Sequence, residues 1–186
     1  RKLFRKTWAF FETFVGPDDH WLPPDNFQEH PVPVVAHRTS PTNMGLALLA
    51  NLAAYDFGVI SAGKLIDRTQ KTLHTMEGME RHRGHFYNWY DTQTLQPLLP
   101  LYISSVDSGN LAGHLLTLRP GLLELCNQPL LGTQFCEGLQ VTLAIVYDQL
   151  ATIPAGATSN QLLQLQHRLA SISRSQPATL SALQSC

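Results

Sequence analysis

The sequence is poor in charge and has no long apolar run, and each shortage excludes a class of function. Only 13 of its 186 residues are Lys or Arg, and the formal net charge is −1. Because binding to nucleic acid requires a concentrated basic surface, these scattered cations exclude nucleic acid as the partner. No apolar run approaches the roughly 18 uncharged residues that indicate a membrane span, and no signal-peptide pattern is present. We therefore expect no membrane span within these residues.

Cysteines are also few, and their spacing argues against a metal or a disulfide framework. Cys126, Cys136 and Cys186 have no metal-ligand spacing and cannot all pair within one chain, which predicts reduced thiols and a reducing compartment. His82 and His85 are three residues apart, but no cysteine or carboxylate pattern completes a site around them. We predict no metal site. A serine nucleophile elbow is also missing.

Apolar residues recur at helical spacing in the first half of the chain. Residues 2–15 predict an amphipathic helix, and residues 41–57 predict a helix that Ser40 caps and that is apolar on most of its circumference, so it should be buried on more than one side. Residues 61–81 predict a more ordinary amphipathic helix. Its predicted inward residues are Leu65, Ile66, Leu73, Met76 and Met79.

Helical spacing continues in the second half of the chain. Residues 111–126 predict a helix with a kink or break at Pro120, and residues 132–150 predict another. The tail from residue 157 predicts one more helix, followed after Pro177 by a short one. This pattern predicts an all-α class, with residues 1–186 forming one domain, or part of one, built as a bundle of helical hairpins. Helices joined in antiparallel pairs are compatible with an α/α toroid.

One central stretch departs from the helical pattern. Residues 85–90 and 96–103 carry the aromatic and branched residues of one short β-ribbon, with a polar turn between them. Ser104 or Ser105 then caps a helix, and Asp107 in its first turn is favourably placed at the positive end of the helix dipole. The stretch therefore predicts a ribbon followed by a helix start.

Two loops combine ring faces with amides and carboxylates, which are the groups that bind sugars. The candidate substrate-binding residues are Trp21, Asp25, Phe27, Glu29, Arg38, Tyr87, Trp89, Tyr90, Asp107 and Asn110. A structural alternative stays open, because capping explains the serines and the aspartate, and aromatic rings in proline-rich loops often cover a core. Glycoside cleavage or transfer needs two carboxyl groups at a defined separation, which sequence does not reveal. The catalytic residues are therefore unknown.

Four stretches resemble a known family, and they occur in the family's order. They are WAFFETFVGPDDHWLPPDNFQE, PVVAHRTSPTNMG, RHRGHFYNWYD and SSVDSGNLAGHLLTL. The set resembles the bacterial cyclic β-1,2-glucan synthases, in the part leading into their glucoamylase-like middle domain. The similarity covers about residues 7–118, and residues 119–186 form a helical continuation.

The resemblance implies a fold, an activity and a setting for the chain. The parent would be a very large inner-membrane enzyme with a glycosyltransferase region that uses UDP-glucose, this middle region, and a phosphorylase-like region. The middle region would be an α/α toroid that transglycosylates linear β-1,2-glucan and closes the ring. The resemblance places the parent at the cytoplasmic face of the bacterial inner membrane. The absence of an initiator methionine likewise suggests a piece of a longer protein.

Two functional hypotheses follow. The leading one is a glucan-binding part of the transglycosylating domain, inactive alone, with its essential acids further along the parent chain and no cofactor of its own. Its partners would be β-1,2-glucan and other domains of the parent, with self-association through truncated apolar faces. The alternative is a non-catalytic helical interaction or spacer module. Convergence of Trp21, Trp89 and Asp107 on one cleft would favour sugar binding, and dispersal would favour the spacer.

Overall fold

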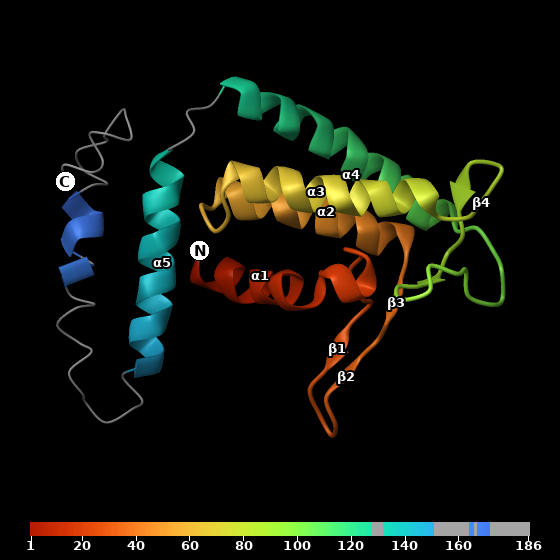
Figure 1. Cartoon of the computed structure of the whole chain (residues 1–186), viewed down its shortest axis with the longest axis horizontal. Coiled ribbons are helices and arrows are strands. Elements are labelled where there is room, and N and C mark those ends of the chain that lie inside the picture. Colours follow the sequence, from red (N-terminus) through yellow and green to blue (C-terminus); the bar gives the residue numbers. More distant parts are fainter. Residues whose placement is uncertain (128–131, 151–163, 166, 172–186) are drawn as a thin grey trace.

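The fold is helical, with three short strand pairs (Figure 1). The computed structural model describes residues 1–127, 132–150, 164–165 and 167–171. The helices within these residues are α1 (Lys2–Phe14), α2 (Pro41–Asp56), α3 (Ala62–Gly78), α4 (Ser105–Glu124) and α5 (Thr133–Leu150), with 3-10 turns at Pro17–Asp19 and Leu125–Asn127. The predicted all-α class is confirmed. The tail helix is described only at 164–165 and 167–171, where the backbone is helical, and the helix predicted after Pro177 lies outside the described residues.

Helix α2 is the centre of the bundle, and it packs against α1, α3 and α4. Ser40 caps it as predicted, because its Oγ accepts a hydrogen bond from the Asn43 N–H at 3.2 Å and Pro41 follows in the first turn. Apolar residues surround most of its circumference, so neighbours bury it on several sides. The main core cluster comprises Leu22, Met44, Leu48, Met76, Met79, Tyr90, Leu111 and Leu118.

Helix α3 matches its predicted pattern except at one position. Ser61 caps it, with its Oγ accepting from the Lys64 N–H at 3.2 Å. Leu65, Met76 and Met79 are buried and Leu73 is half-buried, but 54% of Ile66 is exposed, so the prediction that Ile66 points inward is wrong. Consecutive helical residues are rotated by about 100°, and with Leu65 facing the core its neighbour faces outward.

Helix α4 runs without interruption through Pro120, so no break occurs there. Ser104 is its N-cap, which settles the choice between the two serines, and its Oγ accepts from the Asp107 N–H at 3.1 Å. Proline removes one helical hydrogen bond, but packing on α2, which buries Leu111 and Leu118, holds the helix on both sides of it. In Figure 1, α4 lies across α2 and α3 on the face opposite α1.

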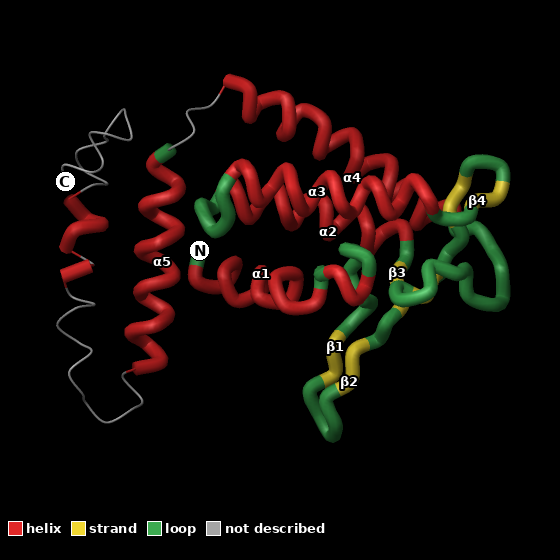
Figure 2. The backbone as a smooth tube through the Cα atoms, viewed as in Figure 1, coloured by secondary structure: helices red, strands yellow, loops and turns green. Residues whose placement is uncertain are grey.

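The short strands (yellow in Figure 2) form three antiparallel pairs. They are β1 (Phe27–Gln28) with β2 (Val34–Val35), β3 (Arg38–Thr39) with β6 (Tyr90–Asp91), and β4 (Arg81–His82) with β5 (His85–Phe86). The ribbon expected from residues 85–90 and 96–103 remains as a bridge between Tyr90 and Pro97 and as a hydrogen bond from the Leu98 N–H to the Trp89 carbonyl at 2.9 Å. Strand β6 pairs with β3 as well, and this long-range pairing brings residues 21–29, which we term the proline loop, to the central stretch.

Candidate functional site

The first turns of α2 and α4 meet at one end of the bundle. Thr42 in the first turn of α2 donates its hydroxyl to Oδ1 of Asp107 in the first turn of α4, at 2.6 Å. The Nδ2 group of Asn110 donates to the Thr42 hydroxyl at 3.1 Å. Two helix N-termini, each with a partial positive charge, therefore flank one carboxylate. Around it lies what we term the polar cluster: Asp25, Arg38, Thr42, Asn43, Asn88, Trp89, Asp107 and Asn110.

The environment of Asp107 keeps its carboxyl group ionised. Burial by itself would raise the pKa of this carboxyl, but hydrogen bonds with Ser104, Thr42 and Ser40 outweigh burial and hold the pKa below its usual value. A general acid in glycoside chemistry needs a raised pKa so that it carries a proton at working pH. Asp107 is therefore suited to accept hydrogen bonds and not to protonate a leaving group.

Trp89 supplies an aromatic ring beside this carboxylate, and Asn88 joins the two. We orient the buried Asn88 amide so that its Nδ2 donates to Asp107 Oδ2 at 2.9 Å and its Oδ1 accepts from Trp89 Nε1 at 2.7 Å and from the Tyr102 hydroxyl at 2.6 Å. This orientation pairs donors with acceptors throughout, whereas the reverse sets the amide oxygen against the carboxylate. The indole ring and the carboxylate are thereby held by one side chain.

Arg38 completes the polar cluster on the side of the proline loop. Its guanidinium carbon lies 5.0 Å from the centroid of the Trp89 ring, a cation–π distance, and its Nη2 donates to Asp25 Oδ2 at 3.0 Å. Asn43 Nδ2 donates to the other oxygen of Asp25 at 3.3 Å. About half of the Arg38 side chain is exposed (51%) and about a fifth of the Asp25 side chain (21%), so solvent reaches this face.

A second group of polar contacts fixes the backbone just before Arg38. His37 Nδ1 lies 2.8 Å from Oδ1 of the buried Asp19, and the Thr92 hydroxyl donates to the same oxygen. The Thr92 N–H donates to the His37 carbonyl at 3.1 Å. These contacts tie the start of β3 to the turn after β6 and so fix the register in which Arg38 faces Asp91.

The remaining candidate residues lie outside the polar cluster. Trp21 makes its ring contacts on α3, with Lys71 Nζ 4.4 Å from its centroid. The Phe27 ring lies 4.8 Å from the Phe14 ring of α1, and Glu29 is exposed beyond β1. Thus Trp89 and Asp107 converge through Asn88, whereas Trp21 packs on a different element.

The two candidate tyrosines, Tyr87 and Tyr90, lie where the central stretch packs against the core. Tyr90 is fully buried, and its hydroxyl donates to the Glu80 carbonyl at 2.7 Å and accepts from the Tyr87 N–H at 2.7 Å. Burial raises the pKa of this hydroxyl to about 12. Tyr87 is half-buried with its ring against Tyr90. Tyr90 is therefore a core residue that a ligand does not reach, which the aromatic spacing alone did not indicate.

Sequence reasoning missed three members of the polar cluster. Thr42 and Asn43 lie in the stretch PTN after the Ser40 cap, where the sequence signalled only a helix start. Asn88 lies between Tyr87 and Trp89, and an amide between aromatic residues was the available signal. None of the three carries a charge, so a search guided by rings and ionisable groups passes over them.

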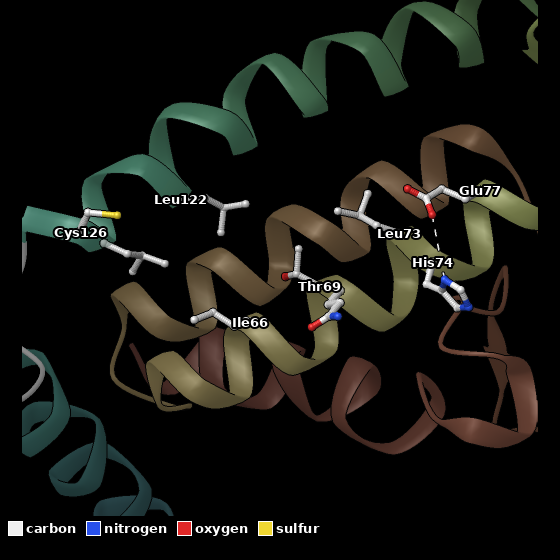
Figure 3. Close-up of a pocket in the computed structure, with 9 residues that line it drawn as sticks. Ile66, Thr69, Leu73, His74, Glu77, Leu122 and Cys126 are labelled. Carbon is white, nitrogen blue, oxygen red and sulfur yellow. Dashed lines mark ion pairs between the residues drawn. The ribbon is translucent and has the colours of Figure 1, made fainter.

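A separate groove opens between α3 and α4 (Figure 3). Its volume is about 550 Å³. The lining residues are Ile66, Thr69, Gln70, Leu73, His74, Glu77, Leu122, Leu125 and Cys126. Within the described residues, no three His, Cys, Asp or Glu side chains gather as metal ligands would, and no helix is long and apolar enough to cross a membrane. The α3/α4 groove is mostly apolar and contains no member of the polar cluster.

Comparison with known proteins identifies one relative by sequence. The chain is 45% identical over 155 residues, 83% of its length, to the cyclic beta-(1,2)-glucan synthase NdvB of Rhizobium meliloti (strain 1021). The matched region spans 6% of that relative's length. No protein-family model matches the chain. The resemblance expected from the four sequence stretches is confirmed.

A putative glucoamylase from Bacteroides fragilis NCTC 9343 superposes with a TM-score of 0.44 and 18% sequence identity, over 89% of this chain and 33% of that chain.

Proposed function

We propose that the chain supplies a glucan-binding surface, centred on the polar cluster, to a larger polypeptide that transglycosylates β-1,2-glucan. The observation that carries the proposal is the Trp89 ring held beside the ionised Asp107 carboxylate, with the Arg38 guanidinium over one face of the ring and Asn110 bonded to Thr42, the hydroxyl partner of that carboxylate. A glucose ring has an apolar face that stacks on an indole and hydroxyl edges that need charged or amide partners. The polar cluster offers both kinds of group within one solvent-accessible area.

The surface binds glucan without performing chemistry by itself. Asp107 is an acceptor because its carboxyl pKa is lowered, and the Asp25 carboxylate is engaged by Arg38 and Asn43. The acids that cleave and transfer the glycosidic bond would lie elsewhere in the longer polypeptide. In that polypeptide, another region would use UDP-glucose as donor, and the whole would act at the cytoplasmic face of the inner membrane.

Titration with linear β-1,2-glucan tests the binding proposal directly. The chain has three tryptophans, so its ¹H–¹⁵N spectrum should contain three indole N–H signals. We expect the Trp89 signal to move on addition of glucan, with a dissociation constant of about 1 mM or below, while those of Trp8 and Trp21 stay in place. Trp89→Ala should weaken binding at least about tenfold, and Trp21→Ala is the matched control.

The outcomes separate the hypotheses. Native affinity in a folded Trp89→Ala variant, or no response of the Trp89 signal to glucan, would show that the polar cluster is structural. Incubation with the same glucan should yield neither hydrolysis nor cyclisation. Turnover that Asp107→Asn or Glu29→Gln abolishes would place catalytic acids inside this chain and overturn the assignment.

The α3/α4 groove supports a second candidate, a helical interaction module. Its walls expose Ile66 and leave Leu73 and Leu122 half-buried, and an apolar area of this kind is typical of a surface that another element covers. In the longer polypeptide, a neighbouring domain would pack there. In the isolated chain, the same surface would drive self-association.

A further inference from the structure

We infer that Asn88 is a positioning residue that holds the sugar-stacking ring and the sugar-binding carboxylate in a fixed relation. The inference rests on the proposed glucan-binding function and deepens it. Asn88 itself is 6% exposed, so it does not present its amide to a ligand. It acts through Trp89 and Asp107.

Each polar atom of the Asn88 amide has a defined task. Its Oδ1 accepts two hydrogen bonds, from Trp89 Nε1 at 2.7 Å and the Tyr102 hydroxyl at 2.6 Å, and its Nδ2 donates to Asp107 Oδ2 at 2.9 Å. Trp89 is half-buried, its indole N–H has this oxygen as its acceptor, and the same acceptor sets the angle of the ring. A rigid ring and a rigid carboxylate give a ligand both contacts without a further cost in side-chain ordering.

The backbone of Asn88 anchors this arrangement. Its N–H donates to the Tyr102 carbonyl at 2.9 Å, so Tyr102 is tied to Asn88 through both the main chain and the side chain. Substitution of the side chain leaves the main-chain contact in place. Loss of ring or carboxylate position in such a variant is therefore attributable to the amide.

Asn88→Asp is the informative substitution, because aspartate has the shape of asparagine but no N–H. The titratable groups that contact the Asn88 side chain are Asp107 from α4 and Tyr102 from the segment just before α4. Across the Trp89 ring lie Arg38 from β3 and its partner Asp25. At pH 7 the new carboxylate would face Asp107 without a proton between them. As the pH falls, two adjacent carboxylates share a proton, and the hydrogen bond to Asp107 returns.

We expect the affinity of Asn88→Asp for linear β-1,2-glucan to be at least tenfold below wild type at pH 7 and within about threefold of it at pH 4, where a pair of adjacent carboxylates holds a shared proton. The wild-type affinity should change less than about threefold over this range. The Trp89 indole signal of the variant should titrate between the two pH values, while the Trp8 and Trp21 signals do not. A folded variant that binds like wild type at both pH values, or equally weakly at both with an unmoved Trp89 signal, overturns the inference.

Tyr102→Phe keeps the inference testable if Asn88→Asp does not fold. About half of Tyr102 is exposed (46%), so the loss of its hydroxyl is tolerated, and Asn88 loses one of its three partners. We expect a three- to fivefold loss of affinity and a shifted Trp89 signal; no change in either contradicts the inference. The pH titration of the Trp89 signal in Asn88→Asp does not require glucan. If the wild-type chain fails to bind glucan, the proposed function is refuted, and the spectra of the variant still test the positioning role of Asn88.

Discussion

The polar cluster and the α3/α4 groove both involve α4, yet they are built in opposite ways. In the polar cluster, hydrogen bonds join side chains from α2, α4, the proline loop and the central stretch. The Asp107 carboxylate, for example, accepts from both Thr42 and Asn88. In the groove, Ile66 from α3 and Leu122 from α4 line the open space (Figure 3). The polar groups of the cluster thus find partners within the chain, whereas the groove is an apolar surface without cover among the described residues.

The difference shows which surface is preorganised and which depends on a neighbour. Hydrogen bonds within the polar cluster fix its geometry before any ligand arrives, which suits recognition of a small polar molecule. An apolar groove offers area without direction, which suits packing of a helix or a domain. Four measurements test this contrast.

The groove wall should contribute little to the stability of the isolated chain. Leu48 on α2 is fully buried, whereas Ile66 on the groove wall is 54% exposed. We expect Leu48→Ala to lower the free energy of unfolding by about 2–5 kcal/mol and Ile66→Ala by less than about 1 kcal/mol. Urea unfolding curves measure both. Equal losses would mean that the groove wall belongs to the core and that the contrast is false.

Asp107→Asn should disturb the polar cluster in a pH-dependent way. The two oxygens of Asp107 accept from the Thr42 hydroxyl and from Asn88 Nδ2. An asparagine has one side-chain oxygen and can accept from only one of these donors, while its own NH2 group faces the second. We expect this mismatch to cost about 1–3 kcal/mol of unfolding free energy at pH 7. The folded-state pKa of Asp107 lies below the usual 3.8, so its contribution to stability is present above that value and is lost as the pH falls through the lower folded-state pKa. The difference in unfolding free energy between wild type and variant should therefore shrink below about pH 4.

Asp18→Asn provides the control for this measurement, because Asp18 is exposed in the turn after α1. Its unfolding free energy should follow wild type across the same pH range. A wild-type-minus-variant difference for Asp107→Asn that stays constant from pH 7 to pH 3 would show that the ionised carboxylate is not what holds the cluster.

Self-association should occur through the α3/α4 groove and should weaken when charge is placed in it. We expect Ile66→Glu to raise the dissociation constant of the associated state at least about tenfold, because it buries a charge against an apolar surface. Sedimentation velocity over a range of concentrations measures this. Val34→Glu, on an exposed residue of β2, should leave it unchanged. Wild-type chain that stays monomeric at all concentrations would refute self-association.

Cysteine alkylation should report on the α3/α4 groove through a smaller effect, a difference of a few-fold in alkylation rate between two thiols. Cys126 lines the groove and is exposed, whereas burial, followed by the nearby Glu137 carboxylate, raises the pKa of the Cys136 thiol. In a Cys186→Ser background, iodoacetamide should label Cys126 faster than Cys136, since the thiolate is the reactive form. Labelling of Cys126 should slow at protein concentrations where the chain associates. Equal rates for the two thiols would count against this assignment.

Local signals in the sequence predicted the helical framework well. Ser40, Ser61 and Ser104 each cap a helix through a hydrogen bond to an N–H three residues on, and capping depends on neighbours within one turn. Helix periodicity likewise indicated that Leu65 and Met76 are buried. These features are encoded within a few residues, so they are accessible without tertiary information.

The polar cluster required information that the sequence does not carry locally. Trp89 and Asp107 were chosen for their chemistry, but the amide between them and the pairing of β3 with β6 depend on contacts between distant segments. Trp21 shows the converse case, a residue that was predicted but does not join the cluster. Its residue type suits a sugar site, yet the loop places its ring on α3. Residue chemistry selects candidates, and only the tertiary fold decides which of them meet.

The bond between Thr42 and Asp107 joins residues 65 positions apart, and the bond between Asn110 and Thr42 joins residues 68 apart. During synthesis, the first segment of the cluster therefore leaves the ribosome well before its partners, at roughly 5–20 residues per second. The contacts of high sequence separation must form after α4 has emerged, and their closure entropy delays them further. The polar cluster is thus completed late in folding, and a nascent chain ending before residue 107 should present α2 and the proline loop without the contacts of Asp107 and Asn110.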